Sequence, residues 1–286
     1  MTKPQGKNPP RTPDAAAEKQ REIQREQDRR DESKAKPSGG EQKSKPVQAG
    51  DRPQPSELPA QHLEKPGLEA DLQLEPQFMA PGYEGSRKLQ DMAALITGGG
   101  SGIGRAVGVR YAREGADVAG VYLNEHEGAQ ETKRCVEAEG RRCVLIPGDV
   151  KSAQFCRDAV DQAVKAFGKL DILVNNAAFQ EHAESLEDIT DERLEETLHT
   201  NIGGYFYMAR AALPHLKQGA SIINTGSVVG LKGSARLLDY STTKGAIHAF
   251  TKSLAQNLLE KGIRVNAVAP GPVWTPLNPA DSPAEK

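Results

Sequence analysis

The 286-residue sequence predicts an α/β domain built on a doubly wound parallel sheet. Six short apolar runs of strand length alternate with five segments of helical periodicity, which is the order expected for such a sheet. The first run breaks into a glycine-rich turn, residues 98–104, that opens a helix. Polar residues suited to chemistry follow several other runs. Because right-handed crossovers bring all carboxyl strand ends to one rim, these positions should lie close together.

The amino-terminal part of the chain differs from the rest in composition. Residues 1–67 contain few large apolar side chains and are rich in Pro, Gln, Lys, Glu, Asp and Ser. Such a segment cannot bury enough apolar surface to offset its ordering entropy, so we expect a disordered polar tail. Pairs such as Glu18 and Arg21 would alternatively support a transient helix. We expect residues 68–87 to form a partly docked linker and residues 88–286 the folded domain.

Charge and cysteine usage exclude several classes of protein. The formal net charge is −2 and no basic patch stands out, so nucleic-acid binding is not expected. No apolar run approaches the roughly 20 residues that span a bilayer, and the amino terminus lacks a signal-peptide core. The three cysteines show no metal-ligand spacing. We expect a cytoplasmic protein with reduced thiols that acts on a small molecule and holds no metal.

The first strand–turn–helix unit indicates a dinucleotide site. A strand over residues 92–97 leads into the glycine turn, and the helical pattern that follows ends at Glu114 and Gly115. Glycines permit the tight turn, the approach of backbone N–H groups to a pyrophosphate, and close packing of helix on strand. Residues 88–286 are therefore predicted to be a dinucleotide-binding catalytic domain.

The end of the second strand, residues 116–122, leaves the choice between NAD and NADP open. An acidic residue there holds the ribose 2′-hydroxyl of NAD, and a basic residue suits the 2′-phosphate of NADP. The corresponding positions carry Leu123 and Asn124, which specify neither cofactor. Glu125 is a candidate acid, and it is equally compatible with a solvated helix start.

Three further polar positions have both a structural and a functional interpretation. Asp149 follows the strand at residues 142–146 and would read adenine or cap the helix through residues 155–167. Asn175 follows the strand at residues 168–174 and would satisfy turn backbone or line the cofactor site. Asn201 lies on the apolar face of a long helix after Asp191. Residue type alone favours a structural role for Asn201 over the anchor of a water chain.

The most informative stretch joins a serine to a tyrosine and a lysine. Ser227 follows the buried strand at residues 220–225. Tyr240 and Lys244 are four residues apart, so they share one face of the helix that continues to residue 259. A sixth strand at residues 263–268 leads into a loop that begins at Pro270 and Gly271. These groups would meet at the carboxyl rim and share one reacting oxygen.

Together these motifs resemble the short-chain dehydrogenases/reductases, which have a single Rossmann-type domain. The resemblance spans about residues 88–279, and it is strongest to the glucose-dehydrogenase-like branch with a polar amino-terminal extension. Its marks, in order, are the Thr97-Gly98-x-x-x-Gly102-Ile103-Gly104 motif, Asp149, Asn175-Asn176-Ala177, Asn201, Ser227, Tyr240-x-x-x-Lys244 and Pro270-Gly271.

The resemblance implies hydride transfer between NAD or NADP and an alcohol or carbonyl substrate. Tyr240 would be the general acid/base, with its pKa lowered by Lys244, which would also hold the nicotinamide ribose. Ser227 would bind the substrate oxygen, and Asn201 would hold a water molecule that links Lys244 to solvent. The expected cofactor-binding residues are Thr97, Gly98, Ser101, Gly102, Ile103, Gly104, Asn124, Asp149, Val150, Asn175, Ala177, Tyr240, Lys244, Pro270, Gly271, Val273 and Thr275.

The chain departs from the family pattern in two places. Ala178 stands where the family often has Gly, a change that we expect to be tolerated. The sequence also stops soon after Pro270 and Gly271, without the usual helical substrate lid and seventh strand. We therefore expect an exposed, apolar sixth strand and a pocket open on one side. The alternative to an enzyme is a non-catalytic dinucleotide-binding or scaffold protein. A complete chain would be expected to form a homo-oligomer.

Overall fold

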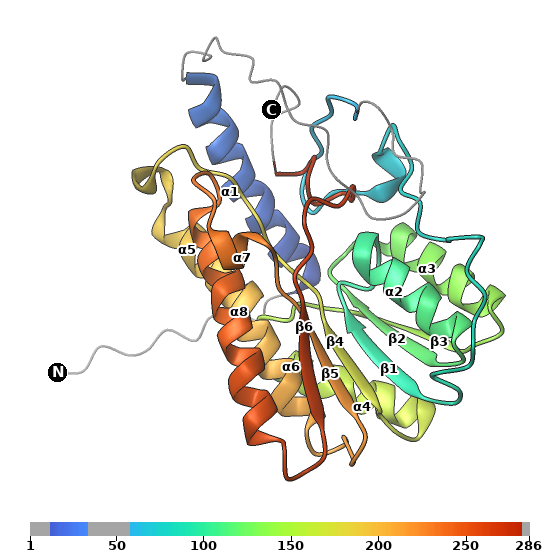
Figure 1. The fold of residues 1–286 in the computed structure, drawn as a ribbon. Helices are drawn as coiled ribbons and strands as arrows, with labels where there is room; N and C mark the ends of the chain where they lie inside the picture. Colours follow the sequence, from blue (N-terminus) through green and yellow to red (C-terminus); the bar gives the residue numbers. More distant parts are fainter. Residues whose placement is uncertain (1–11, 34–57, 282–286) are drawn as a thin grey trace.

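The computed structural model describes residues 12–33 and 58–281. Six parallel strands form one sheet in the order β3-β2-β1-β4-β5-β6 (Figure 1). The strands are β1 (Ala93–Thr97), β2 (Asp117–Tyr122), β3 (Cys143–Pro147), β4 (Ile172–Asn175), β5 (Ser221–Thr225) and β6 (Arg264–Val268). The predicted doubly wound sheet is confirmed. The strands are short because a glycine, proline or polar residue lies at or soon after the end of each apolar run.

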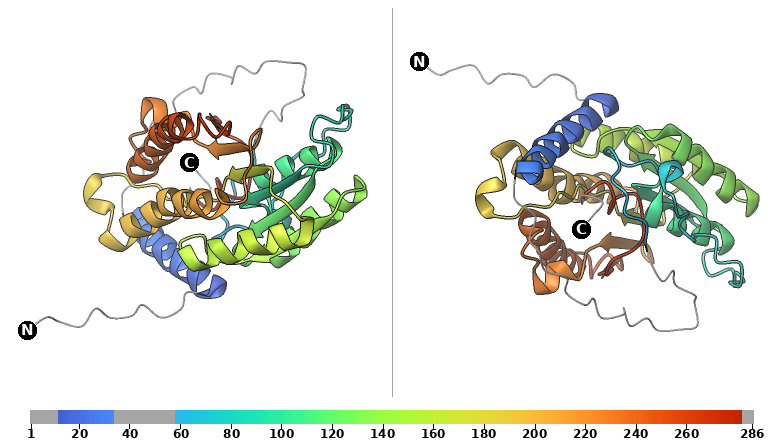
Figure 2. Two further views of the ribbon diagram at one scale, coloured as in Figure 1. Left: turned by 90° about the horizontal axis from the view of Figure 1, so that it is seen from below. Right: turned by 90° about the horizontal axis from the view of Figure 1, so that it is seen from above.

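Helices cover both faces of the sheet (Figure 2). One layer holds α2 (Gly102–Arg113) and α3 (His126–Ala138), and the other holds α4 (Ala153–Phe167), α6 (Gly204–Ala212) and α8 (Leu238–Asn257). Two apolar clusters fill the layers, one around Ile96 and Val136 and the other around Leu173 and Met208. Since β1 pairs with both β2 and β4, the strand order reverses beside β1. That reversal opens a crevice at the carboxyl ends, where ligands bind in such folds.

The long helix expected after Asp191 is interrupted. The structure has α5 (Asp191–Leu198), a single π-helical turn η3 (His199–Gly203) and then α6. Such a turn widens the helix locally and is frequent at functional sites. It contains Asn201, whose side chain bonds the loop that follows β4. The remaining short elements are η1 (Glu69–Asp71), η2 (Leu186–Asp188) and α7 (Val229–Lys232).

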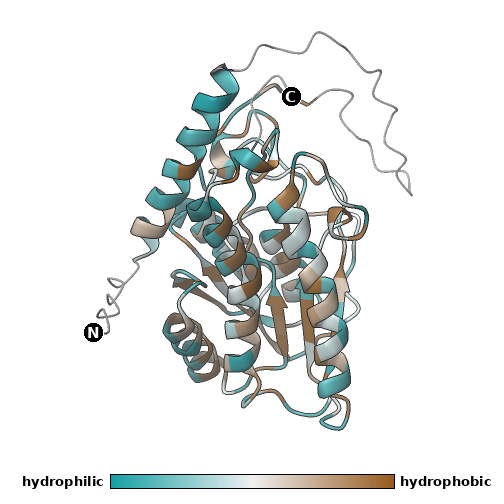
Figure 3. Ribbon diagram, turned by 90° about the vertical axis from the view of Figure 1, so that its left-hand side faces the viewer, coloured by the Kyte–Doolittle hydropathy of each residue, from teal (hydrophilic) through white to brown (hydrophobic). Residues whose placement is uncertain are grey.

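The expectation of a disordered tail is wrong for residues 12–33 and 58–67. Residues 13–33 form the helix α1 (Pro13–Ser33), which lies beside α5 (Figure 1). Colouring by hydropathy shows that most of α1 is hydrophilic (Figure 3). The expected pair between Glu18 and Arg21 forms at 3.1 Å. The other residues assigned to the tail, 1–11 and 34–57, lie outside the described part of the chain.

Buried glutamine side chains hold α1 on the domain. Gln20, Gln24 and Gln27 are each less than 10% exposed and lie on one face of the helix. The Gln24 amide donates to the carbonyls of Leu63 and Ala280, at 2.8 and 3.0 Å. A prediction from composition considers only the apolar surface area that a segment can bury. It does not include docking through hydrogen bonds between buried side-chain amides and backbone groups. This is the physical reason that the disordered-tail expectation fails for residues 12–33 and 58–67.

The sixth strand is the edge of the sheet, as expected. Within the described residues, β5 is the one strand that pairs with β6. Four of its five residues are exposed, and Val268 is 56% exposed. Arg264 and Asn266 make this edge less apolar than the sequence pattern predicts. Residues 269–281 leave β6 and fold back over the carboxyl rim towards the segment before β1 (Figure 1).

Candidate active site

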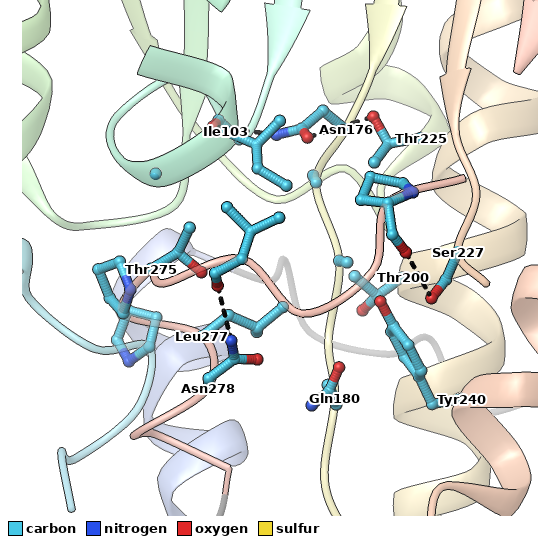
Figure 4. A pocket seen from close by; sticks show the side chains of 18 of the residues that line it. Ile103, Asn176, Gln180, Thr200, Thr225, Ser227, Tyr240, Thr275, Leu277 and Asn278 are labelled. Atoms are coloured by element: carbon cyan, nitrogen blue, oxygen red, sulfur yellow. Dashed lines mark hydrogen bonds between the residues drawn. The ribbon is translucent and has the colours of Figure 1, made fainter. Parts of the chain in front are cut away.

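A cavity of about 390 Å³ lies at the carboxyl rim and runs from the glycine turn to Tyr240 (Figure 4). It lies beside the strand-order reversal, where the fold predicts a ligand site. The predicted site residues that line it are Gly98, Ser101, Gly102, Ile103, Asp149, Val150, Ala177, Ser227, Tyr240, Lys244, Pro270, Gly271, Val273 and Thr275. The predicted residues outside its lining are Thr97, Gly104, Asn124, Asn175 and Asn201.

The glycine turn has the backbone that a dinucleotide requires. Gly98 and Gly102 adopt positive φ angles of 65° and 51°, which side-chain-bearing residues rarely adopt. The helix α2 begins at Gly102, and its first residues line the cavity, a favourable place for phosphates; the Gly102 N–H itself donates to the Glu69 carboxylate at 2.7 Å. A Cβ atom on Gly104 would lie 1.9 Å from the carbonyl oxygen of Gly98. Gly104 therefore contributes through packing, without lining the cavity.

We expect Gly104→Ala to weaken cofactor binding and to lower the free energy of unfolding by about 1–3 kcal/mol. The added methyl group meets backbone, so the turn must move to accept it. Chemical denaturation and a titration with NADPH or NADH measure the two effects. Gly82→Ala is the matched control, since a Cβ atom there meets nothing within 4 Å. Equal cofactor affinity in wild type and Gly104→Ala would contradict the packing argument.

The end of β2 supports binding of a ribose without choosing between the two cofactors. Leu123 and Glu125 line the cavity, and the Glu125 carboxylate accepts a hydrogen bond from the Asn124 N–H at 2.9 Å. The Asn124 side chain is not in the lining, although its buried Oδ1 has no hydrogen-bond partner among the described residues. Glu125 is thus tied to its own turn and is also within reach of a ligand.

Asp149 does not cap the helix after it. Ser152 caps α4, because its hydroxyl accepts from the Phe155 N–H at 3.2 Å. Asp149 is 4% exposed, lines the cavity and accepts from the Lys151 N–H at 2.9 Å. The capping interpretation of Asp149 is therefore wrong, and its position is compatible with reading an adenine.

Thr97, Asn175 and Asn176 join neighbouring strand ends. The Thr97 hydroxyl accepts from the backbone N–H groups of Asn176 and Ala177, at 2.9 and 3.0 Å. Asn175 is fully buried, and its Nδ2 donates to Oδ1 of Asn224 at 3.0 Å. The cofactor-lining expectation for the Asn175 side chain is therefore wrong, because this side chain lies beside Asn224 on the face of the sheet that α8 covers. Asn176 lines the cavity in its place.

Asn201 fixes the loop that follows β4. Its Oδ1 accepts from the Phe179 N–H and its Nδ2 donates to the Phe179 carbonyl, both at 2.8 Å. Its Nδ2 also donates to the Thr243 hydroxyl at 3.0 Å. The side chain is fully buried and lies outside the cavity lining. The neighbouring Thr200 lines the cavity, and its buried hydroxyl has no hydrogen-bond partner among the described residues.

Ser227, Tyr240 and Lys244 meet at one end of the cavity, as the sequence predicts. Lys244 is 1% exposed; its Nζ lies 5.3 Å from the centroid of the Tyr240 ring and donates to the Thr225 carbonyl at 2.8 Å. Ser227 is oriented by the Val229 N–H, which donates to its hydroxyl at 3.3 Å. Figure 4 shows the Ser227 and Tyr240 side chains on the same side of the cavity.

Burial moves both titrating groups towards their neutral forms. It raises the pKa of Tyr240 well above its ordinary value; Asp281 adds to this, and a hydrogen bond with Ser227 acts against it. Burial also lowers the pKa of Lys244 to about 7. In the protein without cofactor the net shift of the Tyr240 pKa is therefore upward, and its lowering by Lys244 stays a prediction. With a pKa of about 7, the Lys244 amine is only partly protonated at neutral pH, and it donates to the Thr225 carbonyl.

A buried ionic cluster borders the cavity at Gln180. His182 pairs with Asp31 of α1 at 2.5 Å and with the Asp281 backbone carbonyl at 2.7 Å. Burial would lower the pKa of His182, but hydrogen bonds with Asp281, Glu181 and Asp31 outweigh it and raise that pKa to about 10. His182 is therefore charged at neutral pH.

This cluster predicts a loss of stability in alkali. The pKa of His182 is higher in the folded protein than in the unfolded chain, where it is 6.5. Its charge therefore stabilises the fold fully at pH values below 6.5, and this contribution is lost as the pH rises through about 10. We expect the difference in unfolding free energy between wild type and His182→Gln to reach at most about 5 kcal/mol at low pH and to shrink through this window. Denaturation at pH 6 and about pH 10.5 measures it. A difference that does not change with pH would contradict the assignment.

Two residues of the cavity wall had no signal in the sequence. Gln20 of α1 and Pro66 of the following segment both line the cavity. They lie more than 130 residues before Ser227 in a segment whose composition predicts a tail. Glu69, three residues after Pro66, also reaches the site: its carboxylate accepts a hydrogen bond from the Gly102 N–H at 2.7 Å and pairs with Arg105.

The family model of the short chain dehydrogenases matches residues 92–286. General stress protein 39 of Bacillus subtilis is 54% identical over 232 residues, which cover 81% of each chain. NADPH-dependent aldehyde reductase 1, chloroplastic, of Arabidopsis thaliana is 50% identical over 237 residues, 81% of this chain and 82% of the relative. Glucose and ribitol dehydrogenase of Daucus carota is 47% identical over 234 residues, 80% of each.

Solved structures agree with these relatives. A short chain dehydrogenase from Burkholderia cenocepacia in complex with NADP has a TM-score of 0.65 and 40% identity, over 68% of this chain and 80% of that one. One from Mycobacterium paratuberculosis bound to NAD has a TM-score of 0.64 and 35% identity, over 67% of this chain and 76% of that one. The chain belongs to the short-chain dehydrogenase/reductase family.

Membership in this family makes the chain an oxidoreductase that uses NAD or NADP. Nothing among the relatives supports the alternative of a non-catalytic scaffold. In the described residues, no helix is long and apolar enough to cross a membrane.

Proposed function

We propose that the chain is a carbonyl reductase and alcohol dehydrogenase in which Tyr240 is the general acid/base. One observation carries the proposal: Ser227, Tyr240 and Lys244 line the same cavity as the glycine turn. In the reduction, the Tyr240 hydroxyl gives its proton to the carbonyl oxygen, and the Ser227 hydroxyl donates a hydrogen bond to that oxygen. The nicotinamide supplies or accepts the hydride.

Lys244 serves as the proton source behind Tyr240. A pKa of about 7 lets its amine gain and release a proton near neutral pH, which suits a relay. The π turn at Asn201 gives the relay a route to solvent through a bound water, because such a turn leaves backbone groups without their usual helical partners. The Asn201 side chain acts through the position of Phe179 and Thr243.

The cofactor would lie along the cavity. The glycine turn would hold the pyrophosphate through N–H groups at the start of α2 other than that of Gly102, which donates to Glu69. Asp149 and Val150 would flank the adenine. Val273 and Thr275 would contact the nicotinamide end, and Lys244 the adjoining ribose.

The substrate is best matched by a small aldehyde or alcohol that carries further hydroxyl groups. Gln180 and Thr200, an amide and a hydroxyl residue, line the cavity near Tyr240 (Figure 4). Two relatives are named for reduction of aldehydes and for oxidation of glucose and ribitol, and these names support the same class.

A cofactor titration followed by a substrate panel tests the proposal. Trp274 is the single tryptophan and lies in the loop that lines the cavity, so its fluorescence reports binding of NADPH and NADH. We expect the better-bound cofactor to be oxidised when glyceraldehyde or another hydroxylated aldehyde is added, as the nicotinamide absorbance falls. Binding of the cofactor without turnover on any carbonyl would reject the enzymatic proposal and favour the non-catalytic alternative.

A further inference from the structure

The segment that precedes β1 lies over the site, in contact with the last described residues. The Leu63 N–H donates to the Pro279 carbonyl at 3.0 Å, and the two stretches run side by side at the carboxyl rim (Figures 1 and 2). Leu63, Leu72 and Ala280 are buried together, with Trp274 packed against them. Trp274 Nε1 also donates to the Leu74 carbonyl at 2.7 Å. The loop beside the nicotinamide end therefore rests on the amino-terminal segment.

Lys65 fixes this segment to the loop after β4. Its side chain is 3% exposed, and its Nζ donates to the carbonyls of Gln180 and Ala280 at 2.8 and 2.6 Å. The same ammonium pairs with the fully buried Glu181 at 3.0 Å. Since a buried charge is tolerated only when it is paired, Lys65 has one well-defined position. Pro66, the next residue, is thereby held in the cavity wall.

The helix α1 approaches the cavity from the side of α5. Gln20 is 8% exposed, and its Nε2 donates to Glu196 at 3.1 Å. Glu196 and Thr200 are four residues apart, so they lie on the same side of the α5–η3 stretch. Among the described residues, no partner bonds the Gln20 Oε1 or the buried Thr200 hydroxyl. Both side chains line the cavity.

We propose that the amino-terminal segment, residues 12–33 and 58–72, forms the outer wall of the substrate pocket, and that Gln20 binds a substrate hydroxyl group. The inference rests on the proposed function and adds a determinant of specificity to it. The amide oxygen of Gln20 accepts a hydrogen bond from a hydroxyl that a simple aldehyde or alcohol lacks. The buried cluster of Asp31, Lys65, Glu181, His182 and Asp281 holds this wall in place.

Binding of alcohols to the protein loaded with reduced cofactor tests the proposal without turnover. We compare ribitol, which carries several hydroxyl groups, with benzyl alcohol, by calorimetric titration of wild type and Gln20→Leu. The variant keeps the size of the side chain and removes the acceptor. We expect the Kd for ribitol to rise about 3- to 10-fold and the Kd for benzyl alcohol to stay unchanged. Glu22→Leu, on the exposed face of α1, is the matched control and should leave both constants unchanged.

Two results would overturn the proposed role of Gln20 in the pocket wall. One is an unchanged Kd for ribitol in Gln20→Leu, and the other is an equal rise in the Kd of both alcohols. Absence of ribitol binding to wild type would also overturn it. Failure of the proposed function gives a different pattern. If wild type oxidises no cofactor with any aldehyde while ribitol binding still depends on Gln20, the enzymatic proposal fails and the wall stands.

Discussion

Tyr240→Phe is expected to lower kcat by about 10²–10⁴-fold while leaving the Kd of the cofactor nearly unchanged. The change removes one hydroxyl group, the proton donor, and keeps a ring that packs in the same 8% exposed position. Steady-state kinetics with a hydroxylated aldehyde, together with a cofactor titration, separates the two quantities.

Tyr111→Phe is the matched control for this experiment. Tyr111 of α2 is also partly buried, and burial raises its pKa. It packs between α2 and the sheet and lies away from the cavity. We expect wild-type kcat for Tyr111→Phe. A Tyr240→Phe protein with kcat within a few fold of wild type would show that another group transfers the proton.

Arg193→Met is expected to lower the free energy of unfolding by about 3–5 kcal/mol. The guanidinium is 2% exposed and pairs with Asp239 at 3.0 Å. It also donates to the backbone carbonyls of Glu181 and His182. The substitution leaves the Asp239 carboxylate buried without its partner. Chemical denaturation measures the loss.

Two controls sharpen the prediction for Arg193. Arg29→Met removes an arginine of α1 that is 72% exposed, and should change stability by less than about 0.5 kcal/mol. Adding Asp239→Asn to Arg193→Met should recover part of the loss, because it removes the unpaired charge. A loss below about 1 kcal/mol for Arg193→Met would contradict the buried pair.

This ion pair also connects the fold to the proposed chemistry. Asp239 directly precedes Tyr240, so Arg193 fixes the start of α8 and the direction in which Tyr240 enters the cavity. The same guanidinium holds the loop that carries Gln180 into the cavity. We therefore expect kcat of Arg193→Met to fall even at temperatures where the variant stays folded.

The sheet and most of the site could be predicted because their signals are local. Short apolar runs ending in glycine or polar residues determine the strands and their shared rim, and the four-residue spacing of Tyr240 and Lys244 determines a common helix face. Ser227 could be placed in the same way, since it follows a buried strand. These features depend on a few neighbouring residues, which a single sequence contains.

The side chains that act through other groups could not be placed in this way. Asn175 and Asn176 are adjacent and chemically identical, and only the direction of the backbone at the end of β4 decides that Asn175 bonds Asn224 while Asn176 lines the cavity. The pKa of Tyr240 depends on how deeply the helix is buried. The docking of α1 depends on glutamine contacts with groups as far away as Ala280.

The central claim is direct hydride transfer from the nicotinamide to a carbonyl carbon. It takes place at the end of the cavity where Ser227, Tyr240 and Lys244 lie. Its most direct test is to incubate the protein with cofactor deuterated at C4 of the nicotinamide and a hydroxylated aldehyde, and to measure the mass of the alcohol formed. With wild type we expect an alcohol that carries deuterium from the cofactor on its new carbinol carbon. With Tyr240→Phe we expect almost no alcohol to form over the same time. An alcohol that forms without deuterium from either face of the nicotinamide would contradict the account.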